Sequence, residues 1–170
     1  MRKQLHHFSQ EHTHQFVTFR TQASVDEFVL LLQESNLDES NKQLSIDQHL
    51  DHSELGCLLN DDIIDLTRLY CQNLDPGHYQ LIALSVMPNH VHMLFQQQLE
   101  LSTIMHKVKG GLTRLINKRL QRNGSLWERG YFDKAIRSEE HFKTTYRYIR
   151  NNAPAAGLID ADRRFFGIYE

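Results

Sequence analysis

Several segments of the chain show the residue pattern of β-strands. Apolar and polar side chains alternate over 15–21, in a run rich in strand-forming residues. The apolar runs 79–87 and 91–97 predict two adjacent strands, or one strand with a bulge at Pro88, because proline cannot donate to a central ladder. Residues 127–136 have the pattern of a loop that leads into a short strand. These segments are the expected strands of the fold.

Apolar residues that recur every three or four positions predict the helices. Ser24 is the expected N-cap of the first helix, and Ser138 begins the capping sequence of the last. The polar, acidic stretch 35–54 is expected to be a loop with a short strand around 43–46. The order of elements predicts an α+β fold in which helices cover an antiparallel sheet. The expected helical ranges are 25–34, 55–73, 101–122 and 139–152.

The composition is that of one ordinary globular domain, which we expect to span residues 1–170. Hydrophobic residues make up 40% of the chain and charged residues 24%. The longest apolar run, 28–32, is far shorter than a membrane span, and the first residues lack the apolar core of a secretory signal. Cys57 and Cys71 are too few for a disulfide framework. We therefore expect a soluble, cytoplasmic protein.

The charge is distributed unevenly along the chain. Residues 1–100 carry a net charge of −9, whereas residues 101–150 carry +8. Such an asymmetry suggests a polyanionic partner, although a solvated basic helix face would give the same pattern. Trp127 is either a ring that stacks on unpaired bases or a core residue. The glycine pair at 110–111 indicates close packing or close approach of DNA. The candidate DNA-binding residues in this region are Lys107, Lys109, Arg114, Lys118, Arg129 and Arg137.

Two histidines are the candidate metal ligands. In Asn89-His90-Val91-His92, alternate residues of a strand point the same way, so His90 and His92 present two imidazoles on one face. Two neutral imidazoles form half of a site for a divalent metal. A His-x-His pair alone is weak evidence in a chain with 11 histidines, but the long apolar strand before this pair strengthens it.

A tyrosine near the end of the last predicted helix is the candidate nucleophile. Tyr148 and Asn152 are four residues apart and share a helix face. A phenol oxygen can attack a phosphodiester when a metal polarises the phosphate, and the Asn152 amide oxygen would be a third ligand. Arg147 and Arg150 would hold phosphates or complement the helix dipole. Tyr146 is a rival nucleophile on roughly the opposite face.

Taken together, these segments resemble the HUH single-strand endonucleases that use one tyrosine. Met87-Pro-Asn-His-Val-His92 is similar to their His-hydrophobic-His metal motif, and Tyr148-Ile-Arg-Asn-Asn152 to their tyrosine helix. Further similarities lie at 19–21, 124–127 and 131–137, in the family's order. The group with the greatest resemblance is the REP-associated tyrosine transposases, and the similarity spans roughly 16–158.

This resemblance implies a ferredoxin-like α+β fold with an HUH endonuclease core. It implies Mg²⁺ or Mn²⁺ on His90 and His92, with Asn152 as the third ligand. It also implies that Tyr148 forms a covalent 5′-phosphotyrosine on single-stranded DNA with REP-type hairpins and releases a 3′-OH. The resemblance favours a monomer, with a dimer as the alternative, associated with the bacterial nucleoid.

Two departures from the family pattern accompany the resemblance. Asn152-Ala153-Pro154 replaces the family's Asn-Pro, so the last helix is expected to run one residue longer. The stretch 35–54 is longer than the family requires and has no assigned role. Two other functions remain open at this point: a REP-hairpin-binding protein without catalysis, and a metal-dependent hydrolase that uses the histidines without the tyrosine.

Overall fold

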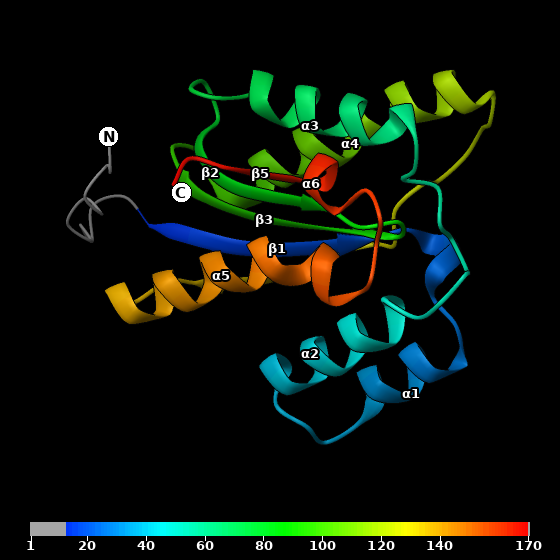
Figure 1. Ribbon diagram of the computed structural model, residues 1–170, viewed down its shortest axis with the longest axis horizontal. Helices are drawn as coiled ribbons and strands as arrows, with labels where there is room; N and C mark the ends of the chain where they lie inside the picture. The colour runs from blue at the N-terminus through cyan, green and yellow to red at the C-terminus, as the bar shows by residue number, and fades with distance from the viewer. Residues whose placement is uncertain (1–12, 170) are drawn as a thin grey trace.

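A five-stranded antiparallel sheet forms the centre of the computed structural model, which describes residues 13–169 (Figure 1). The strand order is β4-β1-β3-β2-β5, and each neighbouring pair is antiparallel. The predicted absence of a secretory signal concerns the first residues, of which 1–12 lie outside the described range. The strands are β1 (His14–Arg20), β2 (Tyr79–Val86), β3 (His90–Gln97), β4 (Phe132–Ala135) and β5 (Phe165–Gly167).

The strand predictions are confirmed for β1 to β4. Pro88 lies in the turn between β2 and β3, where the Met87 amide donates to the His90 carbonyl, so the two apolar runs are adjacent strands. Proline is tolerated here because a turn residue has no ladder bond to donate. A register shift between Leu81 and Ala83 interrupts the pairing within β2 instead.

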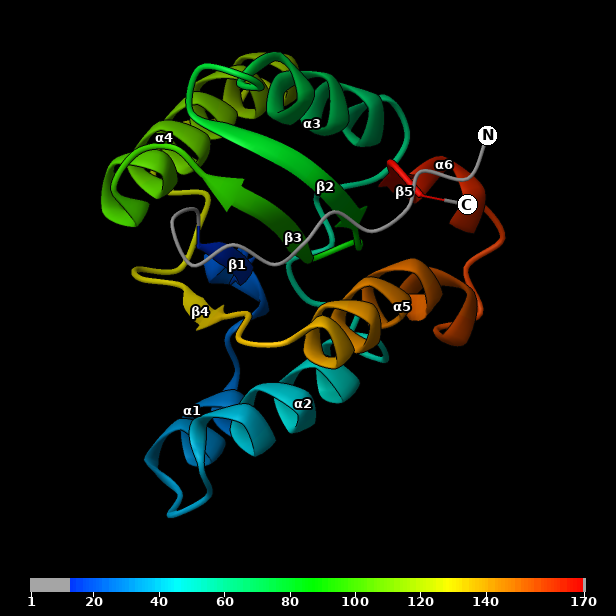
Figure 2. The ribbon, with the colours of Figure 1, turned by 90° about the vertical axis from the view of Figure 1, so that its left-hand side faces the viewer.

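Helices cover both faces of the sheet (Figure 2). On one face α3 (Asp62–Asn73) and α4 (Leu101–Leu120) enclose the larger apolar core, and on the other α5 (Glu139–Ala155) encloses a smaller one. The order β4-β1-β3-β2, with β5 added at its edge, is the predicted ferredoxin-like α+β fold. None of the helices among residues 13–169 has the length and apolarity needed to cross a membrane.

Several helix boundaries differ from the predicted ones. Helix α1 (Glu27–Glu34) is capped by the Asp26 carboxylate and not by Ser24, which lies in a short 3₁₀ turn. Helix α3 begins at residue 62 and not at 55, because the backbone from 55 to 61 is irregular. Helix α5 ends at Ala155, three residues beyond the predicted end at Asn152, and it includes Pro154.

The prediction of a loop with a short strand in 35–54 is wrong. These residues form helix α2 (Glu39–Leu50), whose first turn is capped by the Asp38 carboxylate. The helical pattern is hidden because two of the buried residues, Gln43 and Asp47, are polar. Together α1 and α2 form a helical hairpin below the α5 layer in Figure 1, with a small apolar core of its own made of Val29, Ile46 and Leu50.

The chain ends in two short elements that the sequence did not predict. Helix α6 (Ala161–Arg164) leads into β5, which pairs with β2. The buried Arg164 guanidinium donates to the carbonyl oxygens of Leu59 and Val86, both at 2.9 Å. These charge-assisted bonds fasten the end of the chain to the sheet and to the segment before α3.

The glycine pair in α4 marks close packing at one residue only. A Cβ on Gly111 would lie 1.8 Å from the Tyr70 hydroxyl, whereas one on Gly110 would have open space. We expect Gly110→Ala to stabilise the protein by roughly 0.5–1 kcal/mol through helix propensity. Gly111→Ala instead displaces the Tyr70 ring from its hydrogen bond with the Lys107 carbonyl and costs about 1–2 kcal/mol.

Chemical unfolding of the two alanine variants tests this packing. Both variants replace glycine by alanine in α4, so both gain the same helix propensity. The difference between their unfolding free energies therefore reports the contact with Tyr70. Equal unfolding free energies for the two variants would contradict the close approach of α4 to Tyr70.

A candidate metal and tyrosine site

The two histidines of β3 lie side by side in the layer between the sheet and α5. His90 and His92 are both fully buried, and their ring centroids are 4.8 Å apart. Val91 and Met93 face the opposite core, under α3 and α4. Strand alternation therefore places both imidazoles on one face, as the sequence predicted.

One nitrogen of each imidazole is held by a neighbouring side chain. The His90 Nδ1–H donates to Asn89 Oδ1 at 2.8 Å, and His92 Nδ1 is 2.7 Å from the Thr18 hydroxyl. The other nitrogen, Nε2, is buried without a hydrogen-bond partner in both residues. Burial lowers the pKa of His92 to about 3 and that of His90 well below its usual value, so both rings are neutral. A neutral imidazole oriented through Nδ1 is the form that binds a metal.

Tyr148 of α5 lies against His92, with ring centroids 5.4 Å apart. Its hydroxyl donates a 2.6 Å hydrogen bond to Asp47 Oδ2. Burial, together with the neighbouring Asp47 carboxylate, raises the pKa of Tyr148, and the Asn152 side chain opposes part of this rise. Asn152 is itself buried one helical turn later, and its Oδ1 has no hydrogen-bond partner.

The sequence did not identify Asp47 as a site residue. This aspartate comes from α2, is 2% exposed, and brings a carboxylate oxygen to 3.9 Å from His92 Nε2. Asp47, His90 and His92 offer ligand atoms that all lie within 4.8 Å of one another, so they form a buried group that can hold a metal. Burial raises the Asp47 pKa to about 7. Only the acidic character of 35–54 hinted at this contribution.

A second aspartate of the hairpin also faces the histidines. Asp51 Oδ1 is 3.7 Å from His90 Nε2 and has no hydrogen-bond partner. Burial raises the Asp51 pKa to about 6. The stretch 35–54, which had no assigned role, thus places two carboxyl groups beside the two imidazoles.

The residues present fit a divalent metal. Unpartnered buried polar atoms are costly, yet His90 Nε2, His92 Nε2 and Asn152 Oδ1 are all of this kind. Imidazole nitrogen with amide and carboxylate oxygen is a donor set that suits first-row divalent ions and Mg²⁺. Gln43 Nε2 and the Tyr148 hydroxyl each donate to one oxygen of Asp47. A carboxylate oxygen has two lone pairs, so Asp47 can accept these bonds and still offer a ligand atom beside the two histidines.

Tyr146, the rival nucleophile, points away from this group. Its hydroxyl donates to the Tyr169 carbonyl at 2.6 Å and accepts from the Tyr169 amide at 3.0 Å. A Cβ on Gly167 would lie 2.2 Å from the same hydroxyl, which shows how closely β5 covers it. Tyr146 thus connects α5 to the end of the chain, whereas Tyr148 faces the histidines.

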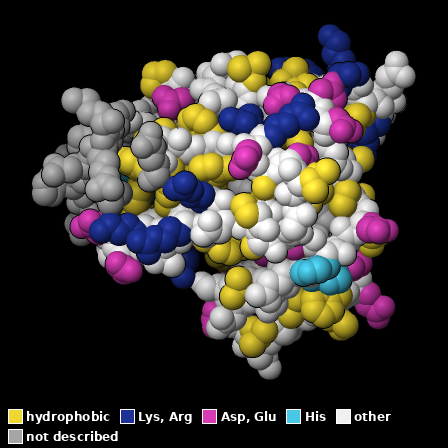
Figure 3. Space-filling view, viewed as in Figure 1, with side chains coloured by type: hydrophobic (Ala, Val, Ile, Leu, Met, Phe, Trp, Pro, Cys, Tyr) yellow, Lys and Arg dark blue, Asp and Glu magenta, His cyan; other side chains and the backbone are white. Residues whose placement is uncertain are grey.

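The predicted DNA-binding residues do not form one surface. Lys107, Arg114 and Lys118 are exposed on α4, which covers the sheet face opposite the histidines. Figure 3 shows Lys and Arg side chains interleaved with Asp and Glu over the α3 and α4 layer. Arg147 and Arg150 are exposed on α5, near the tyrosine, and Arg129 and Arg137 are exposed on either side of β4.

Two of the predicted DNA-binding side chains are engaged within the protein. Trp127 is 6% exposed and packs edge-on against Phe19 at 4.7 Å, so it is a core residue and not an open stacking surface. The Lys109 ammonium donates to the carbonyl oxygens of Glu128 and Gly130, and burial lowers its pKa. Lys109 therefore fastens the loop before β4 to α4.

Comparisons with known proteins give one family match and two similar folds. The family model described as "Transposase IS200 like" matches residues 57–152, a range that begins after the α1–α2 hairpin. A solved structure described as a REP-associated tyrosine transposase bound to a REP hairpin is 15% identical, with a TM-score of 0.53. That similarity covers 94% of this chain and 77% of the other.

A second solved structure, from Deinococcus radiodurans R1 and described as a candidate transposase, is 17% identical with a TM-score of 0.51. That similarity covers 89% of this chain and 98% of the other. At these identities the two likenesses show a shared fold. A search among curated proteins finds no match.

Proposed function

Because this chain belongs to the family of IS200-like transposases, we propose that it is a metal-dependent endonuclease and strand transferase of single-stranded DNA. One observation carries the proposal. The Tyr148 ring lies against His92, which is itself paired with His90, and both of these neutral, fully buried imidazoles have an Nε2 atom without a hydrogen-bond partner. Two adjacent imidazole nitrogens without partners, beside a carboxylate and a tyrosine, are what a metal-assisted tyrosine nucleophile requires.

Each site residue has a distinct role in this proposal. His90, His92 and Asn152 would hold Mg²⁺ or Mn²⁺, with Asp47 and Asp51 as the neighbouring carboxyl groups. The bound ion would polarise the phosphate as a Lewis acid. Thr18 and Asn89 orient the imidazoles through Nδ1, so Nε2 is the nitrogen that would bind the ion.

In the covalent step, the bonds that form and break at phosphorus join it to this chain and to the DNA strand. The Tyr148 oxygen bonds to phosphorus, and the bond from phosphorus to the 3′ oxygen breaks. The products are a 5′-phosphotyrosine and a 3′-OH. Asp47 Oδ2, which already accepts the tyrosine hydroxyl at 2.6 Å, takes the phenolic proton, and the leaving oxygen takes a proton from solvent. The covalent bond retains the energy of the cleaved one, so a second 3′-OH can reverse the step.

The substrate and assembly follow from the same residues. The relative bound to a REP hairpin supports single-stranded DNA with REP-type hairpins as the substrate. The exposed Arg147 and Arg150 lie on the tyrosine helix, where they can contact phosphates. Tyr148 reaches His92 of its own chain, with ring centroids 5.4 Å apart, which supports a monomer as the active form.

A gel assay with end-labelled DNA tests the proposed function. Purified protein is incubated with single strands that carry a REP-type hairpin and its flanks, in Mn²⁺, Mg²⁺ or chelator. We expect a slow, detergent-resistant band with either metal and none with chelator. His92→Ala removes one proposed ligand and leaves the Tyr148 side chain unchanged. It should lower the yield of the covalent adduct by at least about 100-fold.

The remaining functions give other results with the same reactions. A mobility shift of the hairpin in a native gel, without any covalent band in the detergent gel, would favour a DNA-binding protein without catalysis. Cleaved strands in excess over protein, with no protein attached, would favour a metal-dependent hydrolase. Either result would contradict the proposed tyrosine chemistry.

A further inference from the structure

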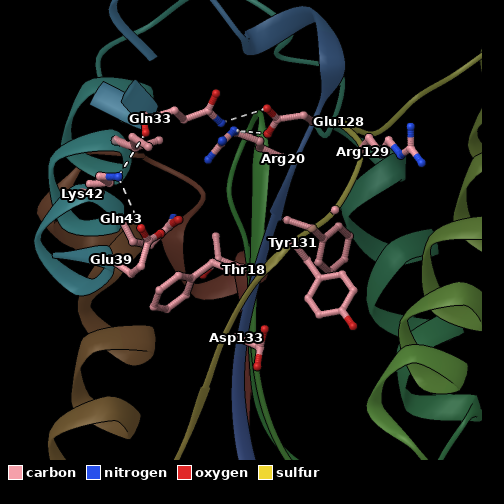
Figure 4. A pocket seen from close by; sticks show the side chains of 14 residues that line it. Thr18, Arg20, Gln33, Glu39, Lys42, Gln43, Glu128, Arg129, Tyr131 and Asp133 are labelled. Carbon is pink, nitrogen blue, oxygen red and sulfur yellow. Dashed lines mark hydrogen bonds and ion pairs between the residues drawn. The ribbon is translucent and has the colours of Figure 1, made fainter. Parts of the chain in front are cut away.

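A cavity of about 430 Å³ lies between β1, the α1–α2 hairpin and the segment 128–133 (Figure 4). This volume is within the range of pockets that hold small organic groups. The cavity lies outside the group of histidines, and none of the roles given above uses it. Its position depends on the hairpin, because α2 forms one whole wall.

The wall nearest the candidate site consists of side chains that also contact the site. Thr18 lines the cavity and meets His92 Nδ1 at 2.7 Å. Gln43 also lines it and donates to Asp47 Oδ1 at 2.6 Å. A single layer of side chains therefore separates the cavity from the residues that would hold the scissile phosphate.

Fixed polar groups occupy the far end of the cavity. The Arg20 guanidinium and the Glu128 carboxylate form an ion pair, and Gln33 Nε2 donates to Glu128 at 3.0 Å (Figure 4). Both charged side chains are largely buried, at 11% and 20% exposure. The pair offers hydrogen-bond donors and acceptors side by side, already held in place.

The charges and rings of the lining select one kind of occupant. Three cationic and three acidic side chains line the cavity, so it does not favour an anion such as phosphate. Tyr131 adds aromatic surface on the side opposite α2 (Figure 4), and Phe132, which pairs with Thr18, also lines the cavity. Flat apolar surface beside a paired donor and acceptor matches a nucleobase, which has a π face and hydrogen-bonding edges.

We infer that this cavity holds one unpaired nucleobase of the DNA strand, next to the phosphate that Tyr148 attacks. The inference rests on the proposed function and adds to it a recognition site for the bases flanking the cleavage point. Arg20 and Glu128 read the edge of the base, and the aromatic side chains contact its face. The hairpin α1–α2, which supplies Asp47 to the candidate site, thereby also supplies part of the sequence recognition.

Binding of strands with single abasic sites tests the inference. The measurement is fluorescence anisotropy in the Tyr148→Phe background, so that no cleavage interferes. Abasic nucleotides are placed one at a time across the four positions on each side of the cleavage point. We expect one position at which loss of the base weakens binding about tenfold. Glu128→Gln should remove most of that tenfold difference.

The matched control is Glu34→Gln, the same change at an exposed residue of the α1–α2 hairpin that does not line the cavity. It should keep the tenfold penalty of the abasic strand. Two results would overturn the inference. In one, the Tyr148→Phe protein and its Glu128→Gln and Glu34→Gln derivatives show the same abasic penalty at every position. In the other, Glu34→Gln removes the abasic penalty as fully as Glu128→Gln does. In either case adducts formed by the wild-type protein would still support the proposed function. Absence of both binding and adducts would overturn the two together.

Discussion

Replacement of Tyr148 by Phe is expected to abolish the covalent protein–DNA adduct and to leave DNA affinity within about threefold. The phenol oxygen is the atom that bonds to phosphorus, so its removal prevents the covalent step. The contacts that hold the DNA strand are not changed. We expect a loss of cleavage of at least ~10³-fold. The measurements are adduct yield in the detergent gel and anisotropy with the same labelled strand.

Tyr146→Phe is the matched control. It removes a hydroxyl of the same kind from the same helix, but one that bonds to Tyr169 at the end of the chain. We expect adduct yield close to wild type and a loss of about 1 kcal/mol in unfolding free energy. Adducts that persist in Tyr148→Phe and disappear in Tyr146→Phe would reverse the assignment of the nucleophile.

Asp47→Asn is expected to stabilise the metal-free protein at alkaline pH. Burial raises the Asp47 pKa from 3.8 to about 7, so between these values the carboxyl is ionised in the unfolded chain and protonated in the folded one. The folded state then binds more protons, and its stability falls as pH rises through this window and stays low above it. Asparagine carries no such cost. Its advantage in unfolding free energy should grow by roughly 2–3 kcal/mol between pH 5 and pH 8.

Excess Mn²⁺ should make the wild-type protein more stable than Asp47→Asn. A metal that binds only the folded state stabilises it in proportion to the logarithm of its concentration over Kd. Loss of the carboxylate beside His92 should weaken metal binding by about 10–100-fold, so Asp47→Asn should gain less in Tm than the wild-type protein.

Thermal and chemical unfolding with chelator and with Mn²⁺, at both pH values, measure both effects. Asp162→Asn, an exposed aspartate of α6, is the control and should show neither effect. An aspartate that serves only the fold would give a variant less stable than the wild-type protein under all four conditions. That result would exclude Asp47 from the metal-binding group.

The sequence by itself determined the part of the site that follows from local geometry. Strand alternation fixes His90 and His92 on one face of β3, and a spacing of four places Tyr148 and Asn152 on one face of α5. These relations hold within one element, so they can be read from spacing alone. The apolar runs on either side of Pro88 likewise determined the central hairpin of the sheet.

The tertiary structure decided whatever depends on contacts between distant elements. Asp47 is buried because α2 lies over α5 and β3, and a polar residue buried in this way breaks the apolar pattern by which a helix is recognised. Trp127 became a core residue through its contact with Phe19 of β1. The charge of α4 suggested a DNA-binding surface, and packing placed that helix on the face of the sheet opposite the histidines. Composition and spacing do not record which face a helix covers, because that choice depends on the whole chain.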